Sequence, residues 1–466
     1  MEINFAGGAY QTFSKTLNPQ ECVNFYPVID KNSGRSPVAL RGTPGLVEWL
    51  DLGSSYEIRN VRQVGTFTYW VCGKNVFRVD SDKNSVQCSG ELATSSGYVW
   101  MEANNADELM LVDGSFGYTI DGLTITRITD TDFPLRPTSV AFQDGYFIVT
   151  YEESGRIYIS DLNDGTSWDG TAYGNAEARP DDSLAVISDH DTLIVFGEKT
   201  KQSFQNTGAT FPFEKISGTT QRIGINAPAS LFQFTNTFFW LTDLIQMVQA
   251  EGQVASYISN PAIEYQFNQM STTSDCVSFG YVQDGSAFLV NQFKTDNQTW
   301  VYDLSTGFWH RRTSYPQEGR WRANCHVFFA NKHLVGDHSN GKIYELDFDT
   351  FTDDSEVIKR KRITPPVFNE GKNLFHSQLE IFFEPGVGLS SGQGSDPMAM
   401  LRYSDDGGFT WSNEIWRSVG KIGKYKWRAV WNRLGVSRNR VYELTVSDPV
   451  KWVITSANLE AEAGMS

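Results

Sequence analysis

Seven short segments recur along the chain at nearly even spacing, each with an apolar β-prone run, a turn and a second run. Successive runs begin 38 to 50 residues apart, and their mean spacing of about 44 residues matches the period of a four-stranded propeller blade. One blade cannot bury both of its faces, so blades stack radially around a channel. The pattern predicts an all-β fold with a β-propeller of six or seven blades. The runs begin at Phe67, Leu109, Phe147, Leu193, Phe238, Phe288 and Leu334.

Turn signals lie between these runs at the density that short antiparallel strands need. Asp and Asn tolerate tight turns, and Gly accepts a positive φ. No long amphipathic helical pattern competes with the strands, although residues 197–208 could form a short helix. A two-sheet sandwich is the alternative, because hairpins occur in every all-β fold. The turn pairs are Asp113-Gly114, Asp121-Gly122, Asp144-Gly145, Asp164-Gly165, Asp284-Gly285 and Asn340-Gly341.

Length and composition narrow the class of protein. A chain of 466 residues with 13 Trp, 19 Tyr and 31 Phe can fill the core of more than one domain. No apolar run reaches 18 residues, and the first residues lack a basic region followed by an apolar core, so neither membrane insertion nor a secretory signal is expected. The five cysteines are widely spaced without a C-x-x-C pair. This pattern favours a reducing cytoplasm over a disulfide framework.

Charge divides the chain near residue 355. Residues 1–354 carry 24 Lys and Arg against 43 Asp and Glu, a net charge of −19, whereas residues 355–466 carry 15 against 12, a net charge of +3. The run Lys359–Arg362 and the pair Pro365-Pro366 indicate a linker between two domains. We therefore predict an N-terminal arm or strands at 1–50, a β-propeller at 51–354 and a β-sandwich at 355–466. The Gly- and Ser-rich stretch 385–397 predicts a mobile loop in the sandwich.

An Asp-box pattern, S-x-D-x-G-x-T-W, lies in the predicted sandwich. In such a box the carboxylate braces the amides of a hairpin turn, Gly takes the positive φ and Trp packs beneath. Asp boxes occur in sialidases and other propeller glycosidases, which leaves a hydrolase as an alternative, but the box itself favours a structural role. Residues 160–168 are a looser version. The box consists of Ser404, Asp406, Gly408, Thr410 and Trp411.

Catalytic and metal motifs do not stand out. A sialidase-like enzyme needs an arginine cluster, a Tyr/Glu nucleophile pair and a separate acid, and no arginine here has the Arg-Ile-Pro context of that family's first strand. His326, His333 and His338, with Asp337, are spaced for strands and turns rather than for one helical face. Neither a nucleophile elbow nor a phosphate- or dinucleotide-binding glycine motif occurs. The sequence therefore predicts no catalytic residues, no metal site and no cofactor.

A basic stretch without acids lies between Glu414 and Glu443, interleaved with Trp416, Trp427 and Trp431. Such interleaving can indicate nucleic-acid contact, but a net charge of −19 over residues 1–354 repels phosphate. The pattern favours an interface with an acidic protein partner, with a solvated pair of strands as the alternative. The candidate interface residues are Arg417, Lys421, Lys424, Lys426, Arg428, Arg433, Arg438 and Arg440.

Several ordered motifs, distributed over most of the length, carry a resemblance. They are VNFYPV at 23–28, LRGTPGL at 40–46, YISDLNDGTSW at 158–168, LIVFGEKTKQSFQNTG at 193–208, and the closing series MLRYSDDGGFTW, KYKWRAVWNRLG and RVYELTVSDPVKWVITSANLE. In their order and spacing the chain resembles the packaged-DNA-stabilising tail-hub, or nozzle, proteins of short-tailed bacteriophages (podoviruses).

The resemblance implies a structural virion protein rather than an enzyme. Such proteins form rings, expected to be homo-hexamers, below the portal and the head–tail adaptor, and they carry the tail needle or plug together with tail spikes or fibres. They complete the head, retain the packaged double-stranded DNA and let it pass without sequence recognition at ejection. The resemblance implies synthesis in the host bacterial cytoplasm and a place in the virion tail, with the sandwich serving ring formation or adaptor docking. The alternative is a propeller tail protein that binds carbohydrate or hydrolyses glycosides like a sialidase.

Overall fold

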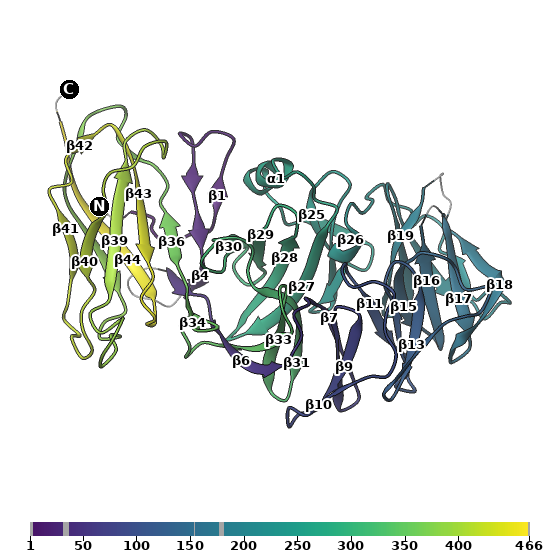
Figure 1. Cartoon of the computed structure of the whole chain (residues 1–466). Helices are drawn as coiled ribbons and strands as arrows, with labels where there is room; N and C mark the ends of the chain where they lie inside the picture. Colours follow the sequence, from purple (N-terminus) through teal and green to yellow (C-terminus); the bar gives the residue numbers. More distant parts are fainter. Residues whose placement is uncertain (1–2, 31–36, 153, 177–180, 465–466) are drawn as a thin grey trace.

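The computed structural model describes residues 3–30, 37–152, 154–176 and 181–464. Strands dominate these residues, and the single α-helix among them is α1 (Pro261–Asn268). Figure 1 shows an elongated molecule with a propeller at one end and a sandwich of strands at the other. The predicted all-β fold, a β-propeller followed by a C-terminal β-sandwich, is confirmed.

The propeller has seven blades in the described part of the chain, each with four antiparallel strands, and the sixth and seventh blades belong to larger sheets. The first blade consists of β7 (Ile58–Val64), β8 (Phe67–Cys72), β9 (Asn75–Val79) and β10 (Ser85–Gln87). The second consists of β11 (Trp100–Ala103), β12 (Leu109–Val112), β13 (Gly117–Asp121) and β14 (Thr124–Arg127). The third consists of β15 (Pro137–Gln143), β16 (Tyr146–Tyr151), β17 (Arg156–Asp161) and β18 (Asp164–Asn175).

The next three blades follow in chain order. They are β19 (Ser183–Asp189), β20 (Thr192–Gly197), β21 (Lys201–Asn206) and β22 (Phe213–Lys215); β23 (Phe232–Phe234), β24 (Thr237–Leu241), β25 (Met247–Glu251) and β26 (Val254–Tyr257); and β27 (Cys276–Gln283), β28 (Ser286–Phe293), β29 (Gln298–Asp303) and β30 (Phe308–Arg312). The segment 197–208, which could have been a short helix, contains the strand β21.

Each apolar run that the sequence indicated belongs to the second strand of a blade, from β8 to β32 (Lys332–Asp337). These strands lie between two neighbours and are packed on both faces, so they contain continuous apolar residues, as in the fully buried β12. The turn pair Asp144-Gly145 has φ angles of 53° and 89°, and Asp284-Gly285 has 49° and 77°. Both pairs adopt the positive φ values that two-residue hairpins require.

The seventh blade is closed by a strand from the other end of the chain. β31 (Ala323–Phe329), β32 and β33 (Lys342–Asp347) are followed by β6 (Gly45–Asp51), which pairs antiparallel with β33. A Cβ atom on Gly45 would clash with the carbonyl oxygens of Thr350 and Thr352, so the closing strand needs glycine there. Two short strands, β34 (Thr352–Asp353) and β35 (Glu356–Val357), extend this sheet.

One continuous sheet joins the propeller to the sandwich. It runs from β30 of the sixth blade through β3 (Cys22–Val23) and β36 (Arg360–Ile363) to β43 (Asn439–Val446), β39 (Met398–Ser404) and β40 (Ile415–Ser418). The facing sheet contains β4 (Phe25–Ile29), β5 (Val38–Gly42), β44 (Val453–Ala463), β38 (Leu374–Phe383) and β41 (Ala429–Asn432). Smaller strands are β1 (Tyr10–Gln11), β2 (Pro19–Gln20), β37 (Val367–Phe368) and β42 (Val436–Ser437).

The segment that the sequence indicated as a linker is a buried strand, β36. Arg360 and Arg362 are 1% and 0% exposed. The guanidinium of Arg362 donates to the carbonyl oxygens of Phe5 and Gly8, both at 2.8 Å, and to Gln20 Oε1 at 2.7 Å. The Arg362 side chain therefore binds the N-terminal residues, whereas the side chains of a linker would be exposed to solvent. The domain limits 1–50, 51–354 and 355–466 stay predictions.

The largest apolar core crosses the junction between propeller and sandwich. It includes Phe25 from the N-terminal strands, Phe267 and Trp309 from the propeller region, and Trp431 and Leu444 from the sandwich. Helix α1 contributes Phe267, whose ring centroid lies 5.9 Å from that of Trp309. Because this core is shared, the two parts cannot separate without exposing buried aromatic surface.

Candidate functional site

The Asp box forms the turn that follows β39. The Asp406 carboxylate accepts the backbone N–H groups of Phe409 and Thr410, each at 2.9 Å, and the Thr410 hydroxyl at 2.5 Å. Ser404 Oγ donates to Asp406 at 2.6 Å and accepts the N–H of Gly408. The hydrogen bonds from Ser404 and Thr410 hold the pKa of Asp406 well below its ordinary value.

The same turn packs against the N-terminal hairpin of β1 and β2. Gly407 has a φ of 81°, and a Cβ atom on it would lie 2.7 Å from Thr16 Cα. The Trp411 ring lies 4.9 Å from the guanidinium of Arg402. The Asp406 carboxylate accepts its hydrogen bonds from backbone amides and hydroxyls of the turn, which is the geometry of a residue that stabilises the turn. The role assigned to these residues stays a prediction.

The basic residues of the C-terminal stretch divide between the two ends of the sandwich. β40 and β41 run antiparallel to β39 and β38, so the loop 419–428 lies at the end opposite to the Asp box. Arg417, Lys421, Lys424 and Lys426 are exposed on β40 and on this loop. Arg433 and Arg438 are exposed at the Asp-box end.

The two remaining arginines of the candidate interface have partners inside the sandwich. Arg428 forms two hydrogen bonds with Glu380, at 2.5 and 2.7 Å. Arg440 is 1% exposed, forms two hydrogen bonds with Asp405, at 2.6 and 2.8 Å, and lies 4.0 Å from the Tyr403 ring centroid. A buried cation needs such pairing, since its desolvation costs several kcal/mol. These contacts give both side chains a structural use, and their predicted role at an interface stays a prediction.

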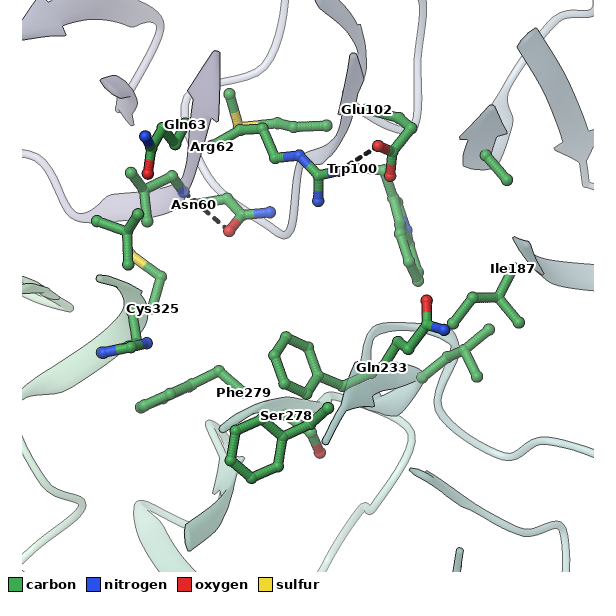
Figure 2. Close-up of a pocket in the computed structure, with 18 of the residues that line it drawn as sticks. Asn60, Arg62, Gln63, Trp100, Glu102, Ile187, Gln233, Ser278, Phe279 and Cys325 are labelled. Carbon is green, nitrogen blue, oxygen red and sulfur yellow. Dashed lines mark hydrogen bonds and ion pairs between the residues drawn. The ribbon is translucent and has the colours of Figure 1, made fainter. Parts of the chain in front are cut away.

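A cavity of about 1010 Å³ occupies the channel of the propeller, lined by the innermost strands of the blades. Figure 2 shows Arg62 and Glu102 on one side of it and Gln233 and Phe279 on the other. Arg62 and Glu102 form an ion pair. Burial raises the pKa of Glu102, and the charge of Arg62 opposes that shift.

The lining of the channel can be compared with the site of a glycosidase. Such enzymes need two carboxyl groups, about 5 to 10 Å apart, and Glu102 is the sole carboxylate among the described residues that line this cavity. His326 and His333 stack with their ring nitrogens 3.1 Å apart, and burial lowers the pKa of His326 to about 3. In the described residues no group of three or more His, Cys, Asp or Glu side chains could hold a metal ion.

The chain folds as a seven-bladed propeller joined through a shared sheet to a sandwich, in which the Asp406 carboxylate braces a turn and Arg440 pairs with Asp405. The chain belongs to the family of bacteriophage P22 Gp10, because the family's β-propeller matches residues 1–351 and its β-sandwich matches residues 359–462. It is therefore a structural tail protein of a bacteriophage and a component of the virion.

Solved structures show similarity at low sequence identity. The extracellular domain of a putative hybrid two component system from B. thetaiotaomicron is 12% identical, with a TM-score of 0.46 over 85% of this chain and 50% of that chain. The WD40 domain of Neurospora crassa Pan2 is 11% identical, with a TM-score of 0.40 over 67% and 96% of the two chains. The computationally designed Ika8 protein is 10% identical, with a TM-score of 0.38 over 64% and 99%. A search of curated proteins found no match. Among the described residues, no helix has the length and apolar character to span a membrane.

Proposed function

We propose that this protein is the tail hub, or nozzle, of a short-tailed phage, which extends the channel of portal and adaptor and closes the DNA-filled head. Family membership over both the propeller and the sandwich supports this proposal most directly. The continuous sheet from β30 to β43 and the shared core give a rigid body. A rigid body suits a closure that bears the pressure of packaged DNA.

The partners follow from this role. The hub assembles with copies of itself into a ring, proposed as a hexamer, and binds the head–tail adaptor and portal on one side. It carries the tail needle or plug and the tail spikes or fibres. Double-stranded DNA passes through the lumen without sequence recognition, because a net charge of −16 repels phosphate rather than retaining it. The role requires no enzymatic step.

Particles made without this protein test the proposal. We expect them to package DNA and then lose it, so that nuclease degrades the genome and infectivity falls by several orders of magnitude. Adding the purified protein to freshly filled heads should restore nuclease protection. Heads that keep their DNA without the protein, with or without later addition, would contradict a closing function.

A carbohydrate-binding or glycoside-hydrolysing tail protein is the second candidate, and the Asp box is the observation that favours it. Native mass and turnover of host surface glycans separate the two. A ring, or ordered addition to portal complexes, supports the hub. A monomer or trimer that releases reducing ends from host glycans supports the hydrolase.

A further inference from the structure

Large apolar side chains gather on the sandwich at the loop between β40 and β41. Tyr425 is 72% exposed, Ile422 60%, and Trp416 and Trp427 51% each. Exposed apolar groups that lie together mark interaction sites, and Trp and Tyr are the residues that most often dominate binding energy at interfaces. We call this surface, together with Arg417, Lys421, Lys424 and Lys426, the basic tip.

The aromatic residues of the basic tip are held by the backbone around them. Trp427 Nε1 donates to the carbonyl oxygen of Ser418 at 2.9 Å. A Cβ atom on Gly420 would lie 2.8 Å from Trp427 Cβ, and one on Gly386 would lie 2.7 Å from the Tyr425 ring. Side chains that are fixed before binding lose less conformational entropy when a partner arrives.

The cations of the basic tip are not neutralised within the chain. The ion pairs at this end of the sandwich join Arg428 to Glu380 and Lys451 to Glu384. In the described residues, none involves the four cations of the tip. The surface therefore presents apolar groups surrounded by unpaired positive charge, which fits an acidic protein surface with some apolar character.

Such an acidic surface lies on the second and third blades. Residues 100–175, which span these two blades, carry 3 Lys and Arg against 13 Asp and Glu. In each of these blades the turn between the first and second strands and the turn between the third and fourth lie at the same edge, because neighbouring strands run antiparallel. We call the turn carboxylates of these two blades the acidic rim: Asp107, Glu108, Asp121, Asp144, Asp161 and Asp164.

The acidic rim also has an apolar contact point. Leu162 is 59% exposed, and a Cβ atom on Gly145 would lie 2.6 Å from Leu162 Cδ1, so two turns of the third blade meet there. The nearby ion pair joins Arg62 to Glu102, whereas Arg136 and Glu152 pair at the opposite edge of the third blade. Across the described residues, no carboxylate of the rim forms an ion pair.

The two surfaces lie at opposite ends of the molecule. In Figure 1, β40 and β41 are at the far end of the sandwich, whereas β13, β17 and β18 are at the far end of the propeller. A subunit therefore cannot bring its own basic tip to its own acidic rim. Any contact between them must join two copies.

We propose that the basic tip of one subunit binds the acidic rim of the next, head to tail, and that this contact forms the ring assigned to the hub. The inference rests on the proposed ring and names its surfaces. A head-to-tail contact uses two different patches and closes into a ring when the rotation between subunits permits. Lysine–carboxylate pairs set the orientation, and the tip aromatics cover Leu162.

Zero-length carbodiimide cross-linking tests this contact directly, because it joins lysine amines only to carboxylates in immediate contact. The full-length protein is used in tails assembled from an equal mixture of isotope-labelled and unlabelled chains. We expect cross-links between labelled and unlabelled copies that join Lys421, Lys424 or Lys426 to Asp121, Asp161 or Asp164. Tails that contain the protein and give other intersubunit cross-links, but none of these, would overturn the proposal.

Charge reversal supplies the second test. The tip variant carries Lys421→Glu, Lys424→Glu and Lys426→Glu, and we expect its self-association in sedimentation to weaken by at least tenfold, because the reversed charges repel the acidic rim. The matched control reverses three exposed cations outside the candidate interface, Lys15→Glu, Lys74→Glu and Lys215→Glu. The control should associate like the wild type. Equal loss in both variants would show that net charge alone matters.

A mixture of two defective variants distinguishes the head-to-tail geometry. The rim variant, Asp121→Lys with Asp161→Lys, should also fail to associate alone. Mixed with the tip variant, it should associate again, because each reversed tip then meets a reversed rim and each normal tip meets a normal rim. A mixture that stays monomeric, while both variants keep the wild-type circular dichroism, contradicts the pairing.

Failure of this inference differs from failure of the proposed function. If the protein is not the hub, heads keep their DNA without it. If only the contact is wrong, wild-type protein closes heads and the tip variant closes them equally well. If the tip instead binds naked duplex DNA at physiological salt and the tip variant does not, the surface is a nucleic-acid site and the proposal fails.

Discussion

Single carboxylates set the acid stability of this protein, and Asp406 is the clearest example. Its folded-state pKa lies below the unfolded value of 3.8 because the hydroxyls of Ser404 and Thr410 and the turn amides bind the charged form. A depressed carboxylate pKa adds stability above pH 3.8 and loses it as pH falls toward the folded pKa.

We expect Asp406→Ala to lower the melting temperature by about 2 °C at pH 7, and the difference from wild type to become smaller as the pH falls below 3.8. Calorimetry of both proteins over pH 2 to 7 measures this. The substitution should leave head closure unchanged. A loss of hydrolytic activity at unchanged melting temperature would instead favour the glycosidase alternative.

His376 affects stability in a higher pH range. It is 2% exposed, and its ring nitrogens lie 2.9 Å from Ser437 Oγ and 2.8 Å from the Tyr442 hydroxyl. Burial, with a smaller effect from the charge of Arg440, lowers its pKa to about 4 from 6.5. The unfolded chain therefore binds a proton more readily than the folded chain, and stability falls as pH drops from 6.5 to about 4.

We expect His376→Gln to remove roughly 2 kcal/mol of the stability lost between pH 7 and pH 4, since one pKa unit corresponds to about 1.4 kcal/mol. Urea unfolding at both pH values measures the difference. An identical loss in wild type and variant would show that His376 is not responsible.

At the scale of elements, the strand β36 connects the propeller to the sandwich, because it pairs with β3 on one side and with β43 on the other. Arg362 on this strand is fully buried and satisfies acceptors of the N-terminal segment. Its neighbour Lys361 forms an ion pair with Glu21 and is partly exposed.

We expect Arg362→Met to destabilise the protein by about 3 kcal/mol, because it leaves several buried carbonyls unpaired, whereas Lys361→Met should cost at most about 1 kcal/mol. Denaturant unfolding of the two variants gives both values. Equal effects would mean that the buried guanidinium is not the main contact.

Local patterns predicted the elements whose environment is local. The second strands of the blades were visible because burial on both faces makes them continuously apolar, and the Asp box was visible because its partners lie within seven residues. The closing strand β6 was not, since its pairing with β33 joins positions nearly 300 residues apart and its sequence resembles any other strand. Helix α1 was also missed, although Asn260 caps it and Pro261 begins it. The pairing of Arg440 with Asp405 depends on the register of β39 and β43. A count of charges along the chain gives no information about that register.

At the scale of the whole molecule, the N-terminal strands make propeller and sandwich one folding unit. β3 lies between β30 of the propeller and β36, β6 closes the seventh blade, and β5 pairs with β44 of the sandwich. The core shared by these parts has no internal boundary at which unfolding could stop. The protein should therefore unfold in a single transition, despite its length.

Separation of the parts tests this unity. We expect residues 355–466 expressed alone to lack a cooperative transition, because they lose β4 and β5 from one sheet and expose the aromatic groups of the shared core. Fusing residues 1–44 to this fragment should restore part of the structure, whereas fusing a scrambled version of the same residues should not. Far-ultraviolet circular dichroism and calorimetry compare the three proteins. An isolated fragment that melts cooperatively, at the temperature of the intact protein, would show that the sandwich folds independently, and the rigid junction would then come from docking rather than from a common core.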